Sequence, residues 1–288
     1  LLQKHQVIMQ VFKLYYLLPI FLVSGPLLGD LLISLSTVFF IFFFLKNEKV
    51  IFKNNFTYLF VLFYIIINVS SIFSYDFLNS IKSSIPYFRF YFFSIIIFYL
   101  LKEKILKIEI FYIILTLLLL LLSLDGIYQF IFKKNIIGFV SPLDYRLTGF
   151  FNDEAVLGSF IARMLPLYFF FFKYIDNHNI KNNLLFYTTF FVSFLCIVLS
   201  GERSSLGLIV IFLILISIFF LNIKEKIFCA TILILGAVLI LNINMLKNRY
   251  VLMTYEVFYT TLGKFSIMDD DIKVSNDEKE FFRREKKV

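Results

Sequence analysis

The chain has 288 residues, of which 60% are hydrophobic and 17% are charged, and its mean hydropathy is +0.87. Soluble domains are about 45 to 50% apolar and cannot bury this much apolar side chain in a core. The composition therefore predicts a polytopic membrane protein. It argues against a secreted disulfide scaffold, a Rossmann or TIM-barrel enzyme, a zinc-finger protein and a nucleic-acid binder, despite the net charge of +8.

Apolar runs between charged breaks predict about nine transmembrane helices in an all-α bundle. They lie at residues 14–28, 31–45, 56–73, 85–101, 106–124, 155–172, 184–200, 204–221 and 227–243. Only Gly29 and Asp30 separate the first two runs, but one helix over both would be about 48 Å long, too long for a roughly 30 Å hydrocarbon core. Because Pro19, Gly25 and Pro26 also break helices, a tight hairpin is favoured over a single helix.

The composition changes after the ninth run. Residues 1–243 are predicted to form the transmembrane domain, and residues 244–288 are polar and charged and are predicted to begin a large loop on the outer side. Within that loop, the stretch Met268–Val288 is expected to be disordered or partly helical. A chain that starts at Leu1 and stops inside a loop at Val288 is expected to be a fragment of a longer product.

The lysines and arginines favour a cytoplasmic N-terminus. With that orientation, twelve basic residues lie in the inside connections and five lie in the outside connections. The inside residues are Lys4, Lys13, Lys46, Lys49, Lys53, Lys102, Lys104, Lys107, Lys173, Lys181, Lys224 and Lys226, and the outside residues are Lys82, Lys133, Lys134, Arg146 and Arg203.

The arginines are distributed differently from the lysines. All seven fall outside or within spans, whereas the twelve inside residues are all Lys. A guanidinium binds phosphate through paired N–H groups, whereas an ammonium acts as a point charge. The distribution indicates an outer face that holds an anion; the alternative is ordinary contact between loop arginines and lipid headgroups. The arginines are Arg89, Arg146, Arg163, Arg203, Arg249, Arg283 and Arg284.

Two of the arginines fall inside predicted spans. Arg89 lies near the start of the fourth span and Arg163 lies within the sixth, so both are expected in the outer half of the bilayer. Such charges cost about 2.5 to 3.5 kcal/mol on insertion scales and normally face the bundle interior. They are candidate ligands, with an internal ion pair as the alternative. The possible carboxylate partners are Asp30, Asp76 and Glu154.

Two short polar segments, residues 145–158 and 199–207, directly precede apolar spans. The first supplies Asn152 or Asp153 as a helix N-cap, with Glu154 in the first turn. The second supplies Ser200 or Ser204 as an N-cap.

Both of the spans that follow these segments run from outside to inside. Two helix N-termini with free N–H groups would therefore face the same side as Arg146 and Arg203. Together these groups are predicted to hold a pyrophosphate.

These two segments resemble motifs of the O-antigen ligase and O-antigen polymerase family. The segment Arg-Leu-Thr-Gly-Phe-Phe-Asn-Asp-Glu-Ala-Val-Leu-Gly-Ser begins at Arg146 and leads into a span that contains Pro166. The segment Leu-Ser-Gly-Glu-Arg-Ser-Ser-Leu-Gly contains Arg203, and Asp-Gly-Ile-Tyr-Gln-Phe, starting at Asp125, fits the same pattern. The resemblance covers about residues 14 to 265.

The resemblance implies a metal-independent, inverting glycosyltransferase in the bacterial inner membrane, active on the periplasmic face and using no cofactor. It would move a glycan from undecaprenyl pyrophosphate to a sugar hydroxyl of lipid A-core, as a ligase, or of another lipid-linked repeat unit, as a polymerase. Both activities belong to lipopolysaccharide and surface polysaccharide biosynthesis. Membrane lipid is the surrounding partner, and no nucleic acid is involved.

The resemblance also implies roles for individual residues. Arg146 and Arg203 would bind the pyrophosphate, with Arg163 and Arg89 as weaker candidates, and Glu154 or Glu202 would orient a guanidinium. The catalytic general base of the family is a His in the large periplasmic loop, which this chain lacks up to Val288. The base is therefore expected beyond Val288.

Other functions are also compatible with the residues. A transporter or flippase would bind the same lipid-linked glycan without reacting it, and a structural membrane subunit would not use the arginines at all. Asp269, Asp270 and Asp271 resemble a metal clamp, but adjacent acids in a charged tail are usually solvated, so no metal is expected.

Overall fold

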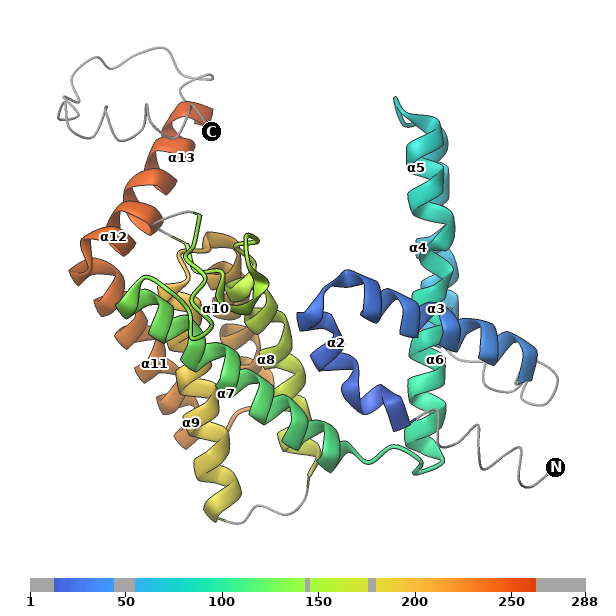
Figure 1. The fold of residues 1–288 in the computed structure, drawn as a ribbon, viewed down its shortest axis with the longest axis horizontal. Coiled ribbons are helices and arrows are strands. Elements are labelled where there is room, and N and C mark those ends of the chain that lie inside the picture. The colour runs from blue at the N-terminus through green and yellow to red at the C-terminus, as the bar shows by residue number, and fades with distance from the viewer. Residues whose placement is uncertain (1–12, 44–54, 143–145, 176–179, 263–288) are drawn as a thin grey trace. The chain divides into compact units, whose positions relative to one another are not determined.

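The computed structural model describes residues 13–43, 55–142, 146–175 and 180–262. Within these ranges the chain is all-helical and contains no β-strand, only an isolated bridge between Lys134 and Val140 (Figure 1). The all-α class predicted from the apolar runs is confirmed. The elements are η1 (Lys13–Leu17), α2 (Leu18–Ser24), α3 (Pro26–Phe43), α4 (Asn55–Ile72), α5 (Phe77–Ser84), η3 (Ile85–Tyr87), α6 (Phe88–Lys102), α7 (Ile108–Phe132), η4 (Gly149–Phe151), α8 (Leu157–Tyr174), α9 (Ile180–Leu199), α10 (Arg203–Phe219), α11 (Ile223–Asn242), α12 (Asn244–Lys247), η5 (Asn248–Leu252) and α13 (Met253–Leu262).

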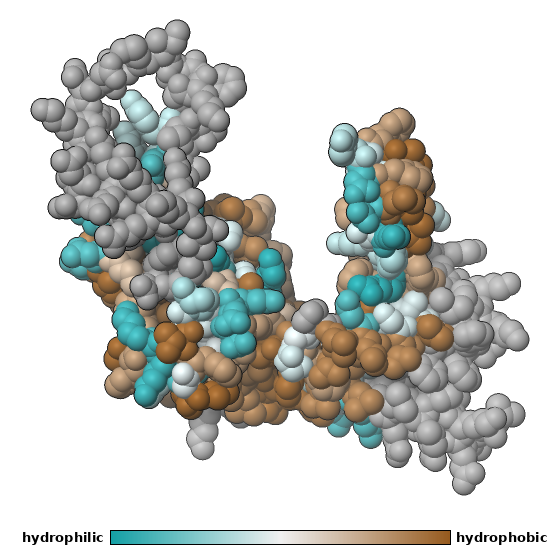
Figure 2. Space-filling model, turned by 45° about the horizontal axis from the view of Figure 1, so that its top comes forward, coloured by the Kyte–Doolittle hydropathy of each residue, from teal (hydrophilic) through white to brown (hydrophobic). Residues whose placement is uncertain are grey.

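Among the described residues, two helical segments are long and apolar enough to cross a membrane, Phe77–Lys102 and Ile108–Phe132. A third crossing is reached if the bent pair Ile223–Asn242 and Asn244–Glu256 counts as one span. Large hydrophobic side chains are exposed along many of the described helices, and Figure 2 shows them over wide parts of the surface. Such a surface fits a lipid environment, because soluble monomers rarely expose contiguous apolar patches of this kind.

The first hairpin turns at a different place from the one predicted. α2 ends at Ser24, and the chain reverses at Gly25, whose φ is +128°, before α3 begins at Pro26. Gly29 and Asp30, the predicted turn, lie inside α3. The reason is that Gly adopts a positive φ without strain and Pro is well placed in the first turn of a helix, whereas a lone Gly inside a helix costs only about 1 kcal/mol.

The chain divides into two compact units, Leu1–Gly236 and Ala237–Val288. In the first unit, α7 packs against α8 and α9, α10 packs against α8, and α6 packs against α3. In the second unit, residues 244–262 are helical, whereas the sequence predicted a polar loop there. Met268–Val288, including Asp269 to Asp271, lies outside the described residues.

One face of α7 forms the centre of this packing. Leu115, Leu119, Leu122, Gly126 and Gln129 are all buried and recur at the three- and four-residue spacing of a single helix face. The same face is apolar in its first half and polar in its last turns. α7 also extends to Phe132, eight residues beyond the predicted end of this span at 124, so Asp125 belongs to the helix rather than to a loop.

α8 contains Pro166 in its interior. Proline has no backbone N–H, so the carbonyl of Ala162 lacks the hydrogen bond that the residue four positions later normally provides. Ala162 is fully buried against the rest of the bundle.

Glycine allows α7 to approach α9 and α8 closely at one point. A Cβ atom on Gly126 would lie 2.5 Å from Cys196 Sγ and 2.7 Å from Leu157 Cδ2, both inside the buried core. These separations are shorter than van der Waals contact, so any larger residue here must push the helices apart.

We expect Gly126→Ala to destabilise the chain by roughly 1 to 3 kcal/mol through overpacking. The measurement is thermal unfolding of the purified chain in detergent. Gly207→Ala is the matched control, because a Cβ there has no atom within 4 Å, and alanine should leave the midpoint unchanged or raise it. Equal midpoints for the two variants would contradict the close approach.

Candidate functional site

Buried polar side chains gather at the end of the bundle where α7 finishes, α8 starts and α9 turns into α10. We call this the loop end; it comprises residues 123–142, 146–159 and 193–205. The buried polar residues here are Ser123, Asp125, Gln129, Asn135, Thr148, Ser193, Ser200, Glu202 and Ser205, each no more than 3% exposed. Burying so many polar groups is costly unless they bond to one another, so their partners define the site.

Gln129 and Asn135 hold the segment that follows Arg146. The side-chain oxygen of Gln129 accepts hydrogen bonds from the backbone N–H groups of Thr148 (3.0 Å) and Gly149 (2.8 Å), and its nitrogen donates to Thr148 Oγ1 (3.1 Å). Asn135 Nδ2 donates to the carbonyl of Gly149 at 2.8 Å. These bonds fix the backbone two and three residues after Arg146.

Asp125 lies beneath the same segment. It is fully buried, and its Oδ1 accepts a hydrogen bond from the N–H of Ile136 at 2.9 Å, whereas its Oδ2 has no hydrogen-bond partner among the described residues. Gly149 has a φ of +55°, and a Cβ there would lie 3.3 Å from Asp125 Oδ2 and 3.2 Å from Leu157. Glycine therefore allows the segment to lie closely over the carboxylate.

Glu202 caps the beginning of α8. Its Oε1 accepts from the N–H of Gly158 and its Oε2 from the N–H of Ser159, both at 3.0 Å, and Ser205 Oγ donates to Oε2 at 2.7 Å. The carboxylate is 3% exposed. A buried carboxylate is stabilised by three such donors and by the positive end of the helix dipole.

The capping predicted for these helices is therefore wrong in detail. Neither Asn152 nor Asp153 caps α8, which begins later, at Leu157, and is capped from another helix by Glu202. α10 begins at Arg203 with Glu202 as its N-cap residue, so Ser200 and Ser204 are not its caps. The first N–H groups of α8 are occupied by a carboxylate of the chain itself and do not face outward as free anion donors.

The two motif segments meet directly. The backbone N–H of Leu147 donates to the carbonyl of Ser200 at 3.3 Å, which joins the segment of Arg146 to the segment of Arg203. Arg146 Nη2 donates to the carbonyl of Ala155 at 2.9 Å, and its Nε is buried without a described partner. Arg203 is the first residue of α10 and is half-buried. Both guanidinium groups thus belong to the loop end.

The other candidate ligands lie elsewhere. Arg89, on α6, pairs with Asp30 of α3 at 3.1 Å, which is one of the ion pairs considered from the sequence. Arg163 is exposed on α8 and does not face the bundle interior, because Gly158, Ala162 and Leu165 occupy the buried face of that helix. Glu154 is exposed in the turn before α8 and does not contact a guanidinium among the described residues.

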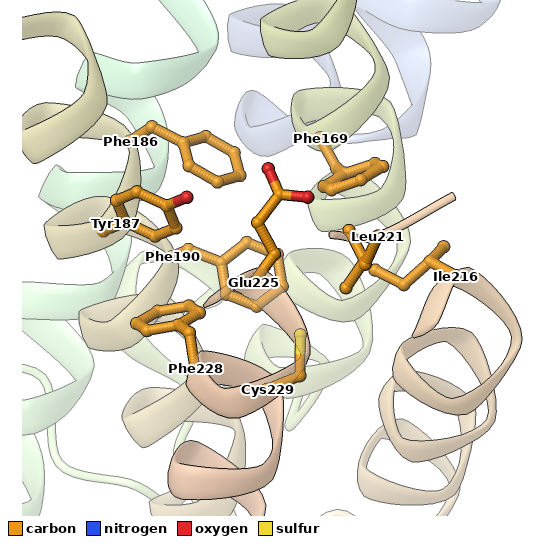
Figure 3. A pocket seen from close by; sticks show the side chains of 9 residues that line it. All are labelled: Phe169, Phe186, Tyr187, Phe190, Ile216, Leu221, Glu225, Phe228 and Cys229. Atoms are coloured by element: carbon orange, nitrogen blue, oxygen red, sulfur yellow. The ribbon is translucent and has the colours of Figure 1, made fainter. Parts of the chain in front are cut away.

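A second feature is a narrow crevice between α8, α9, α10 and α11. Figure 3 shows the Glu225 side chain among the rings of Phe169, Phe186 and Phe190. Its carboxylate pairs with Lys173 and accepts from the N–H of Asn222 at 3.1 Å. The charge is thus already satisfied within the chain, and the crevice is an aromatic core with a half-buried ion pair.

Comparisons with protein-family models, curated proteins and solved structures find no match for this chain.

Sequence reasoning missed three residues of the loop end: Asp125 and Gln129 as buried groups of α7, and Asn135. A signal for them was present, because an acid and an amide four residues apart share one helix face. Reading α7 to its full length would have placed both on the face already occupied by Leu115, Leu119 and Leu122.

We expect Glu202→Ala to destabilise the chain by roughly 2 to 4 kcal/mol, because two buried N–H groups of α8 lose their acceptor. Glu202→Gln keeps one acceptor oxygen and should cost less. The measurement is thermal unfolding in detergent, with Glu154→Ala as the control, an exposed glutamate that should change nothing. A Glu202→Ala variant as stable as Glu154→Ala would show that the carboxylate does not hold α8.

Proposed function

We propose that the chain acts at the periplasmic face of the bacterial inner membrane in the manner of the O-antigen ligases and polymerases, and that it binds undecaprenyl-pyrophosphate-linked glycan at the loop end. The observation that carries this proposal is the junction between Leu147 and Ser200, because it brings the segments of Arg146 and Arg203 together.

The residues at the junction suit a pyrophosphate. Guanidinium groups bind phosphate oxygens through paired N–H donors, and each charge-assisted bond is stronger than a neutral one. Glu202 already occupies the first N–H groups of α8, so recognition of the anion depends on the arginines rather than on the helix end. Gln129 and Asn135 hold the backbone next to Arg146 in place before the ligand arrives.

The chemistry follows from the leaving group. The bond between the anomeric carbon and the pyrophosphate oxygen breaks, and the acceptor hydroxyl oxygen bonds to that carbon from the opposite face with inversion. The hydroxyl proton passes to a general base, which is a histidine in the family that the chain resembles. Polyprenyl pyrophosphate leaves as a stabilised anion, so it needs nearby positive charge rather than protonation by an acid. Arg146 and Arg203 provide that charge in the proposed mechanism.

The proposed topology has about nine spans, with the N-terminus in the cytoplasm. Its support is the lysine-rich set of predicted inside connections and the apolar helices α4, α9, α10 and α11, which add to the two longer segments. The loop end then faces the periplasm, and the Lys173–Glu225 pair lies toward the cytoplasm.

We expect Arg146→Ala and Arg203→Ala each to weaken binding of undecaprenyl pyrophosphate at least tenfold, since one charge-assisted hydrogen bond contributes roughly 1.5 to 3 kcal/mol. The measurement is a titration of the purified full chain in detergent. Lys134→Ala removes an exposed positive charge from the same loop and should leave the affinity unchanged. Equal affinities for all three variants would overturn the site.

A second assay separates transfer from transport. The chain is incubated with undecaprenyl-pyrophosphate-linked glycan and either lipid A-core or a second lipid-linked repeat unit. A lengthened acceptor with release of free undecaprenyl pyrophosphate supports the proposal. Binding of the donor without release would favour the transporter or flippase.

The topology makes its own prediction. A cysteine at Lys134 should react with a membrane-impermeant maleimide applied to cells whose outer membrane has been permeabilised, whereas a cysteine at Glu103 should react only after the inner membrane is opened. Both positions are exposed, and the native Cys196 and Cys229 are buried and serve as the unreactive background. The reverse pattern would invert the orientation and place the loop end in the cytoplasm.

A further inference from the structure

The second unit contains a sharp change of helix direction. α11 ends at Asn242, and the helical segment Asn244–Glu256, made of α12, η5 and the start of α13, follows it at an angle of 98°. Figure 1 shows this turn between α11 and α12. Asn242 and Asn244 flank the bend, and the basic residues Lys247 and Arg249 follow within two turns.

Helix lengths decide how such a bend fits a bilayer. The 20 residues of α11 reach about 30 Å, enough to cross the hydrocarbon core, whereas the segment Asn244–Glu256 reaches only about 20 Å and cannot cross it again. A helix nearly perpendicular to a spanning helix runs close to the plane of the membrane. The polar residues at the bend suit the headgroup region, where α11 would leave the core.

The perpendicular segment has two different faces. Leu246 and Met253 are buried, at 0% and 5% exposure. Val251, Tyr255, Phe258 and Tyr259 are exposed at 41 to 63% and recur at the spacing i, i+4, i+7 and i+8, which is one side of a helix.

Two features of the exposed side suit a lipid surface. Tyr255 and Tyr259 stack with ring centroids 5.8 Å apart, and tyrosine is enriched where membranes meet water. Lys247 is exposed one turn before Val251, where its ammonium would reach lipid phosphates.

We propose that residues 244–262 form an interfacial helix on the surface of the membrane that α11 crosses. Val251, Tyr255, Phe258 and Tyr259 insert at the boundary between headgroups and acyl chains, and Lys247 contacts the phosphates of anionic lipids. The inference rests on the membrane placement of α11 given under the proposed function, and it does not depend on glycan binding or transfer.

The chain contains no tryptophan, so a single introduced tryptophan reports its own surroundings. The full chain carrying Phe258→Trp is reconstituted in vesicles that contain anionic lipid and lipids brominated either near the headgroup or near the chain ends. Because an interfacial face inserts about 5 to 10 Å, the bromines near the headgroup should quench roughly twofold more than those near the chain ends. Tyr255→Trp, on the same face, should behave alike.

Ile234→Trp is the matched control. Ile234 is 65% exposed in the middle of α11, so the bromines near the chain ends should quench its emission more strongly. If this control is quenched and Phe258→Trp is quenched by neither lipid, the aromatic face lies in water or under another part of the protein, and the interfacial helix is wrong.

Two further outcomes would each overturn the proposal. Stronger quenching of Phe258→Trp by the bromines near the chain ends would make the segment a re-entrant helix and overturn the proposal. If Ile234→Trp is itself unquenched, α11 does not cross the bilayer, and both the interfacial helix and the proposed topology fail. Loss of glycan binding in the Arg146 and Arg203 variants has no bearing on either result.

Discussion

The loop end depends on one of its two buried carboxylates, that of Glu202. Glu202 lies at the start of α10, but its carboxylate accepts hydrogen bonds from two N–H groups at the start of α8. It therefore connects two helices through residues that are 44 positions apart in the sequence. Burying a carboxylate costs less when its oxygens are hydrogen-bonded, and Ser205 provides a third donor to Glu202. Gly158 lets this happen, because a Cβ there would lie 2.3 Å from Ser200 Oγ. The meeting of Leu147 with Ser200 follows from the same close approach.

The buried amides of α7 and the loop then set the backbone that carries Arg146. Gln129 accepts hydrogen bonds from two consecutive N–H groups, which an apolar side chain would leave unpaired. Asn135 accepts from the N–H of Gly138 and donates to the carbonyl of Gly149. A fully bonded polar network of this kind specifies one arrangement of a loop more sharply than apolar packing does. Pre-ordering the backbone before a ligand binds lowers the entropy lost on binding.

Sequence alone predicted the all-helical class, because apolar runs are a direct signal. The run at 56–73 corresponds to α4, Asn55–Ile72, and the run at 204–221 to α10, Arg203–Phe219. The ion pair between Arg89 and Asp30 was among the partners considered. The ends of the helices were harder to predict. Hydropathy ends this span just before Asp125, whereas the backbone of α7 continues for two further turns because Asp125 and Gln129 find partners inside the fold.

The details of the loop end could not be predicted, for a physical reason. Capping rules look for an acceptor next to the first turn, and Glu202 caps α8 from a different helix, a relation that has no local signature. The exposure of Arg163 could not be predicted either, because the positions of α7 and α9 decide which side of α8 is buried. The position of the first turn was misjudged because Gly25 and Gly29 are equally permissive, and only the Pro26 that follows Gly25 separates them.

α8 is fixed near both of its ends, by Glu202 at Gly158 and Ser159 and by Glu225 at Lys173, and Pro166 lies between these two attachments. The missing hydrogen bond to the Ala162 carbonyl makes the middle of α8 its most pliable point, so a shift at either attachment is taken up there as a bend. A displacement of the loop end would be taken up as a bend near Ala162 before it reached the aromatic crevice at the other end.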